Sequence, residues 1–511
     1  MIPQSLMITV GFLIGVFLIT VYSYSTNSMI LLYAMVAVPP LVFLINRPDF
    51  LLVCVVALFT SFLSFPGLPW NFSAFLLFAF LFSGIIFVGN IISKNSRPLL
   101  LPYRFALILG LVLLVTASIR GFGIRAFGSE TWGGSLYIHL FVAIWFLLMA
   151  RYCDLTVRQW KLAIYGMCLL SILPAAAQAL YALSGGRIYQ QFMFVSTDVV
   201  STLGVARDVR SSTGLARFQL ANVTSIYVCF LALLMLYRKQ NRLVVYALFG
   251  VMAILVGLSG HRAAMLHNTI LITLYAYLSM KERNVWRVLF NRYTMILGVL
   301  FLVLLLFADK LPLAYQRALS WIPFISVSFE AKMDAASTTG WRYEIWQMML
   351  KEMPKYLLLG KGFAFSAKDV MNVMLGSRDE YAAVLATRNY HNALLGTIMD
   401  LGLPGLFAAL GFIASVVILE LKRLRAPWNS HQLQHYHRVF YASFFAYIIV
   451  YYFFAGGMNA FINMFIWVVV MEGLARADAA LAPKPPEPDA PKLADPKFNR
   501  NSIGRFSSPY R

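Results

Sequence analysis

Charged residues are scarce in this chain of 511 residues. Asp, Glu, Lys and Arg make up 12% of it, whereas 60% of the residues are hydrophobic. A soluble multidomain protein of this length rarely shows such a balance. The scarcity of charge therefore argues against a soluble protein and predicts an all-α, polytopic integral membrane protein.

Cysteine is also rare. The four cysteines show neither CxxC spacing nor a neighbouring His cluster, the patterns that indicate zinc or haem sites. We therefore expect no disulfide, no bound metal and no cofactor. The four residues are Cys54, Cys153, Cys168 and Cys229.

Targeting signals and repeats are also lacking. The opening stretch "MIPQSLMITVGFLIGVFLITVY" has no basic residues of the kind that begin a cleavable signal, so we expect it to remain as the first span. No lipidation motif is present. No internal repeat is visible either, whereas many transporters are built from one.

Long apolar stretches recur from the first residues to about position 475, each close to the ~20 residues that a helix needs to cross a bilayer. They predict about fourteen spans. We divide the chain into N-terminal transmembrane helices (1–204), a second transmembrane region (205–475) with a helical cap loop at 309–390, and a disordered cytoplasmic tail (476–511) rich in Pro and charge.

The formal net charge of +21 comes from Lys and Arg residues that fall mainly in alternate short loops. This pattern follows the positive-inside rule and places both termini in the cytoplasm, with the cap loop outside. The loops predicted on the cytoplasmic side carry Lys94 and Arg97; Arg151, Arg158 and Lys161; Arg238, Lys239 and Arg242; Lys281, Arg283, Arg287 and Arg292; and Lys422, Arg423 and Arg425.

The stretch "NYHNALLGTIMDLGLPGLF" is unusual for a plain anchor. Pro404 cannot donate to the carbonyl of Asp400, so the helix is expected to kink one residue before the proline, with Gly402 and Gly405 allowing close backbone approach. On an ideal helix Asp400 points away from His391 and needs another partner. The predicted shared face contains His391, Leu395, Ile398, Gly402 and Gly405.

His391 stands at the outer end of this helix, where the dipole disfavours imidazolium and favours bound anions. A neutral base beside phosphate fits this position, and a simple capping residue at the membrane interface fits it equally well. In "VGLSGHRAAML", His261 and Arg262 lie at an exterior span end. There an arginine either binds a ligand or snorkels to lipid headgroups.

The cap loop holds a third candidate in "STTGWRYEIWQMML". Arg342, at the expected start of an amphipathic helix, has a planar fork that binds phosphate oxygens bidentately. The alternative is a solvated charge paired with Glu344 or Glu352. The expected apolar face of that helix consists of Ile345, Met349 and Met353, with Pro354 interrupting it.

These motifs resemble the O-antigen ligase and polymerase superfamily. His391, Asn392, Gly402 and Gly405 match its His-Asn and Gly spacing, "SGHRAAM" is similar to its arginine span end, and "GWRYEIW" and "MPKYLLLGKGFAFS" are similar to its loop motifs. Ala263 replaces a usual glycine, and Trp341 is inserted before the arginine. The resemblance covers about residues 205–475.

The resemblance implies that His391 activates an acceptor hydroxyl while Arg262 and Arg342 hold a donor diphosphate. It also implies further residues that contact the substrate. For each of them the alternative is a plain loop charge or a packing residue. The predicted substrate contacts are Asn392, Arg210, Arg217, His261 and Tyr343, with Trp341 and Tyr390 as further aromatic candidates; the predicted structural motif is Gly402, Pro404 and Gly405.

The implied protein is a metal-independent, inverting glycan transferase of the bacterial inner membrane with its site on the periplasmic face. Its donor would be an undecaprenyl-diphosphate-linked glycan. Its acceptor would be lipid A core or a protein for a ligase, which we place first, and a second lipid-linked glycan for a polymerase. A flippase or other transporter is the alternative of another class; no nucleic acid is expected.

Overall fold

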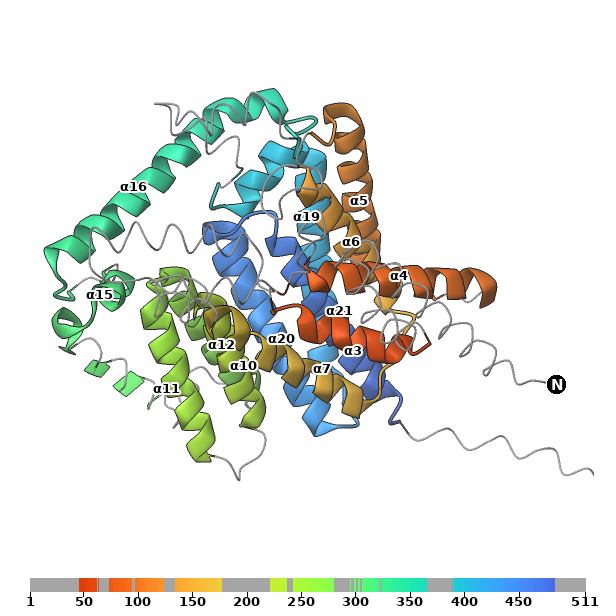
Figure 1. The fold of residues 1–511 in the computed structure, drawn as a ribbon, viewed down its shortest axis with the longest axis horizontal. Helices are drawn as coiled ribbons and strands as arrows, with labels where there is room; N and C mark the ends of the chain where they lie inside the picture. Colours follow the sequence, from red (N-terminus) through yellow and green to blue (C-terminus); the bar gives the residue numbers. More distant parts are fainter. Residues whose placement is uncertain are drawn as a thin grey trace, which may run out of the picture.

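The computed structural model describes residues 46–61, 63, 73–93, 97–123, 134–176, 221–236, 242–279, 306–320, 324–364 and 390–482, together with positions 295, 298, 299, 302, 303, 322 and 388. Within these residues every secondary-structure element longer than one residue is a helix (Figure 1). This confirms the all-α class. The first group is α3 (Pro48–Leu58), α4 (Ala74–Ser93), α5 (Leu101–Arg120), α6 (Ser135–Ala150), α7 (Val157–Leu170), α10 (Ala221–Met235), α11 (Arg242–Ser259) and α12 (Arg262–Ser279).

The second group begins after the long apolar helices of the first half. It comprises η3 (Ala308–Lys310), α15 (Leu313–Leu319), α16 (Phe329–Glu352), η4 (Met353–Tyr356), α19 (Ala393–Arg425), α20 (His431–Tyr447), the π-helix η5 (Ile448–Ala455) and α21 (Ala460–Ala479).

Six helices of the described residues are long and apolar enough to cross a membrane. Four shorter apolar helices accompany them. The chain is therefore a multi-pass membrane protein by its helices, while the count of about fourteen spans stays a prediction. The six are Ala74–Ile91, Leu101–Arg120, Val157–Ala176, Ala393–Arg425, His431–Ala455 and Ala460–Ala479.

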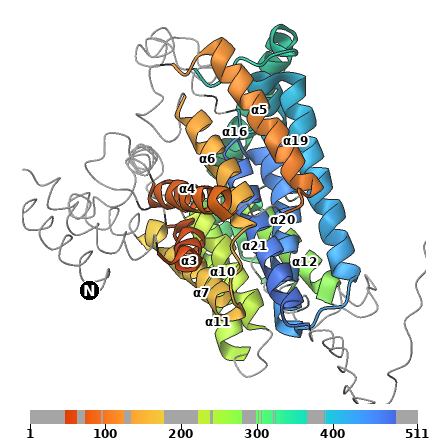
Figure 2. The same ribbon diagram turned by 90° about the vertical axis from the view of Figure 1, so that its right-hand side faces the viewer.

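One hydrophobic core joins helices from both halves of the chain. Residues of α3, α4, α5, α6 and α7 pack in the same cluster as residues of α19, α20 and α21. Figure 2 shows α5 lying along α19, although these helices are far apart in the sequence. The N-terminal helices therefore support the part of the chain that carries the candidate residues.

A network of ion pairs gathers at one end of the bundle. Arg97 pairs with Asp154 at 2.7 Å, Arg476 pairs with Asp154 at 3.0 Å, and Arg423 pairs with Glu472 at 2.7 Å. Three of the basic segments expected on one side thus meet at one end. At ~1.5 Å per residue, the 20 residues of α5 place Arg120 about 30 Å from the end of the bundle that holds this network.

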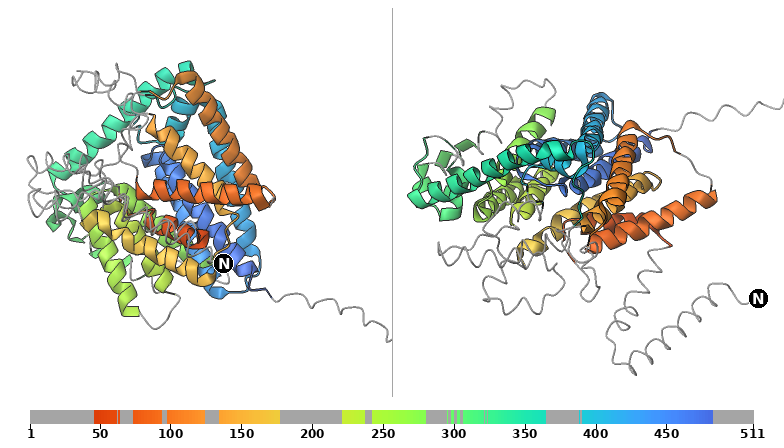
Figure 3. Two further views of the ribbon diagram at one scale, coloured as in Figure 1. Left: turned by 45° about the vertical axis from the view of Figure 1, so that its right-hand side comes forward. Right: turned by 90° about the horizontal axis from the view of Figure 1, so that it is seen from above.

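The helix α16 extends outward from α15 and reaches the end of the bundle near the start of α19 (Figures 1 and 3). It begins at Phe329 because Ser328 caps it, accepting from the Ala331 N–H. The expected helix start at Arg342 is therefore wrong. Ile345 and Met349 are fully buried, as the predicted apolar face requires.

Candidate functional site

The helix α19 is broken at Gly402, whose φ of 71° and ψ of −172° lie in a region that only glycine readily adopts. The expected kink beside Pro404 is confirmed, one residue earlier than predicted. Regular helix starts only at Ala393 and is interrupted at this break, so the predicted common face of His391 and Gly402 is wrong.

The segment 357–362 forms hydrogen bonds with the backbone of α19 on both sides of the break. Leu403 N–H donates to the Leu357 carbonyl at 2.7 Å, Lys361 N–H donates to the Met399 carbonyl at 2.7 Å, and Gly362 N–H donates to the Asp400 carbonyl at 2.9 Å. Backbone groups released by a break inside an apolar helix need such partners. The "LLLGKGF" motif therefore pairs with the backbone groups at the break in α19, and we call residues 357–362 the splint.

The N-terminal helices α5 and α6 also form hydrogen bonds with the splint and with the residue that follows it. Arg120, the last residue of α5, donates to the Gly360 and Leu359 carbonyls at 3.0 and 3.1 Å. The hydroxyl of Tyr137 on α6 accepts from Phe363 N–H at 2.9 Å. The site region is thus anchored by helices outside the second half of the chain.

Asp400 has the partner that its position demanded. Its carboxylate, 1% exposed, accepts from the Tyr390 hydroxyl at 3.2 Å and lies 3.6 Å from Arg388 Nε. Arg388 also donates to the Gly362 carbonyl at 2.9 Å. Tyr390 is buried, so its role is packing and hydrogen bonding, which was one of its two expected roles.

His391 follows this buried cluster directly and has a left-handed backbone, with φ of 53°. Non-glycine residues seldom adopt this conformation, although His does so more readily than most. Asn392 fixes the next position: its Oδ1 caps α19 by accepting from Leu395 N–H at 3.0 Å, and its Nδ2 donates to the Phe453 carbonyl at 2.9 Å. Asn392 thus ties His391 to η5.

The imidazole of His391 faces an aromatic ring and positive charge. Its ring centroid lies 5.4 Å from that of Trp341, edge to face. Burial, the charge of Arg342 and the charge of His261 together lower the pKa of His391 to about 4. Because this value is well below neutral pH, the ring is uncharged at pH 7.

Arg262 and Arg342 both contact or belong to α16, and their charges interact. Arg262 donates to the Ala335 carbonyl at 3.1 Å and to the Thr339 hydroxyl at 3.2 Å, both on α16. Burial and the nearby charge of Arg262 lower the pKa of Arg342. The buried Nε of Arg342 has no hydrogen-bond partner in the part of the chain that the structure describes. A buried donor of this kind fits an anionic ligand.

The remaining predicted residues have different outcomes. Tyr343 is 61% exposed, on the outer side of α16, while His261 is half-buried beside His391. Arg210 and Arg217 lie outside the described residues. Pro404 and Gly405 follow the helix break. Within the described residues, no group of three or more His, Cys, Asp or Glu side chains is arranged to bind a metal.

Sequence reasoning did not identify Arg388 or Arg120, the two arginines that hold the splint. A buried Asp400 was a signal that some cation lies nearby, and Arg388 comes shortly before it in the chain. No local signal connects Arg120 to Gly360, because 240 positions separate them.

Comparison with known proteins gives one family. A family model described as O-Antigen ligase matches residues 247–410. The match contains Arg262, Arg342 and His391, and it excludes Arg210 and Arg217. A search of curated proteins finds no significant match.

Proposed function

We propose that the chain moves a glycan from undecaprenyl diphosphate to an acceptor hydroxyl, as a member of the O-antigen ligase and polymerase superfamily of membrane glycan transferases. The match of residues 247–410 to the family model described as O-Antigen ligase supports this proposal. The observation that carries the proposal is the convergence of an uncharged imidazole, His391, with the two guanidiniums of Arg342 and Arg262.

In the proposed reaction His391 accepts the proton of the acceptor hydroxyl, whose oxygen attacks the anomeric carbon of the donor sugar. The bond from that carbon to the diphosphate oxygen breaks, and the electron pair leaves with undecaprenyl diphosphate. Arg342 and Arg262 stabilise the charge that grows on the leaving group. A single displacement inverts the anomeric centre.

Two observations support a site on the periplasmic side of the inner membrane. Arg97 and Arg423 belong to basic segments that the positive-inside rule places in the cytoplasm, and they lie in the ion-pair network at one end of the bundle. The spanning helices α5 and α19 run from that end to Arg120 and His391. The proposed chemistry therefore lies across the membrane from the cytoplasm.

The acceptor defines the type of enzyme. We place a ligase, with lipid A core or protein as acceptor, ahead of a polymerase that uses a second lipid-linked glycan. Reconstituted protein given the lipid-linked donor and each acceptor separately tests this order. Undecaprenyl diphosphate released only with an acceptor supports transfer, whereas lipid that crosses the bilayer with its glycan intact would identify a transporter instead.

Arg342→Lys should weaken binding of undecaprenyl diphosphate about tenfold or more, because an ammonium cannot reproduce the bidentate fork. The measurement is the dissociation constant of the lipid for protein in nanodiscs. The control is Arg425→Lys, which changes an exposed arginine in the last turn of α19. Equal affinities in the two variants would remove Arg342 from the donor site.

The pH dependence should differ between free and donor-bound protein. The pKa of His391 is about 4 without ligand, and a bound diphosphate favours the imidazolium and so raises it. The acid limb of kcat/KM should therefore lie near pH 4, and that of kcat at a higher pH. Initial rates from below pH 4 up to pH 8 provide the check; a kcat limb at or below that of kcat/KM contradicts this assignment.

A further inference from the structure

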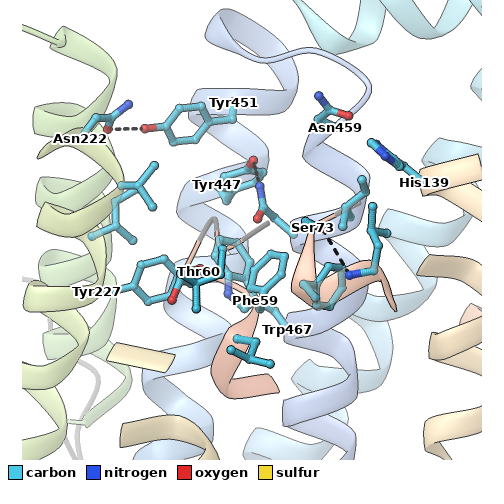
Figure 4. A pocket seen from close by; sticks show the side chains of 18 residues that line it. Phe59, Thr60, Ser73, His139, Asn222, Tyr227, Tyr447, Tyr451, Asn459 and Trp467 are labelled. Carbon is cyan, nitrogen blue, oxygen red and sulfur yellow. Dashed lines mark hydrogen bonds between the residues drawn. The ribbon is translucent and has the colours of Figure 1, made fainter. Parts of the chain in front are cut away.

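A cavity of about 300 Å³ lies among α3, α4, α6, α10, α20, η5 and α21 (Figure 4). None of the residues proposed for the transfer chemistry lines it. Its volume is at the lower end of the range for ligand pockets, roughly 300–1,000 Å³. Its described lining is Leu58, Phe59, Thr60, Leu63, Ser73, Phe75, Leu76, His139, Asn222, Val223, Ile226, Tyr227, Tyr447, Tyr451, Asn459, Ile462, Asn463 and Trp467.

The lining is mainly apolar, with a few polar side chains set into it, and it carries no full charge, since Asp, Glu, Lys and Arg are absent from its 18 described residues. A diphosphate would find no cation there. Three asparagines line the cavity together with aromatic rings. Planar amides that donate and accept, set among aromatic faces, suit a ligand that combines hydroxyl groups with apolar faces, which is the chemistry of an uncharged sugar ring.

Several lining groups have unused hydrogen-bonding capacity. The side chains of His139 and Asn459 make no hydrogen bond with any residue that the structure describes. Asn222 uses only its Oδ1, which accepts from the Tyr451 hydroxyl at 3.0 Å. Asn463 uses only its Nδ2, which donates to the Tyr447 hydroxyl. A hydrocarbon ligand that covered these groups would leave them unpaired, whereas hydroxyl groups would pair with them.

The cavity and the candidate site share one element, the π-helix η5. Tyr451 of η5 lines the cavity, and the carbonyl of Phe453, two residues later, accepts from Asn392 beside His391. Short π-helical segments are rare and occur frequently at functional sites. The element that lines the cavity is therefore also the element that holds Asn392, the residue next to His391.

We propose that this cavity binds uncharged sugar rings of a glycan substrate. The proposal rests on the function proposed above and adds a subsite to it. The sugar rings belong either to the donor glycan, still linked to the lipid, or to the acceptor glycan.

Binding to the full chain in nanodiscs tests the proposal. The probes are undecaprenyl diphosphate, the same lipid carrying a neutral pentasaccharide, and the free pentasaccharide added with saturating bare lipid. We expect the pentasaccharide either to tighten lipid binding at least tenfold, which identifies a donor subsite, or to bind on its own, which identifies an acceptor subsite. His139→Phe and Asn459→Ala should each remove that gain and leave bare-lipid affinity unchanged.

The control is Asn90→Ala on α4, because the amide nitrogen of Asn90 has no hydrogen-bond partner among the residues that the structure describes and Asn90 is not one of the cavity's described lining residues. A pentasaccharide that adds no affinity in either arm overturns the proposal. Cavity variants that weaken bare lipid as much as glycosylated lipid, or that behave as Asn90→Ala does, overturn it as well. Wild-type protein that binds the glycan yet transfers it to no acceptor refutes the proposed function and leaves the sugar subsite standing.

Discussion

The variant His391→Ala should transfer glycan about 10²–10⁴-fold more slowly than the wild type, the range that a positioned general base contributes. The structural reason is that His391 combines an uncharged ring, at a pKa of about 4, with a fixed place beside Arg342 and Trp341. The substitution removes the proton acceptor and leaves both guanidiniums in place. The measurement is the initial rate of undecaprenyl diphosphate release in the presence of acceptor.

Binding of the donor separates this role from a structural one. Donor affinity of His391→Ala should stay within a few-fold of the wild type, because the diphosphate contacts are assigned to Arg342 and Arg262. The matched control is His431→Ala, an exposed histidine at the start of α20. Wild-type turnover in His391→Ala would remove the imidazole from the mechanism, and a loss of donor affinity as large as the loss of rate would indicate a structural role.

The second large effect concerns folding. Gly402→Ala should destabilise the protein through two separate costs. An alanine at φ of 71° and ψ of −172° adds about 1–3 kcal/mol of backbone strain. Its Cβ would also lie 2.8 Å from the Leu357 carbonyl oxygen, and such overpacking adds about 1–3 kcal/mol. Thermal unfolding in detergent should show a clearly lower midpoint.

The control for this substitution is Gly250→Ala in α11, where an added Cβ meets nothing within 4 Å. Its helical backbone tolerates alanine, so its midpoint should equal or exceed that of the wild type. If Gly402→Ala and Gly250→Ala unfold at the same temperature, the break in α19 is not the constrained junction described above.

The break in α19 shows which features could be predicted from neighbouring residues and which could not. The missing N–H of Pro404 and the adjacent glycines were sufficient to locate a kink and close backbone approach. They could not show that the helix changes direction at Gly402 itself, nor that Leu357 and Lys361 bond to the freed backbone groups. The ideal-helix face failed because its geometry assumes an unbroken backbone.

The sequence by itself determined that the chain is helical and membrane-embedded, that α19 is broken, and that His391, Arg262 and Arg342 are the candidate residues. Those properties depend on composition, on short-range spacing and on motif resemblance. Only the tertiary structure decided that Arg120 and Arg388 hold the splint and that a neutral cavity adjoins η5. Contacts between segments far apart in the chain depend on how whole helices pack, and no local pattern encodes that.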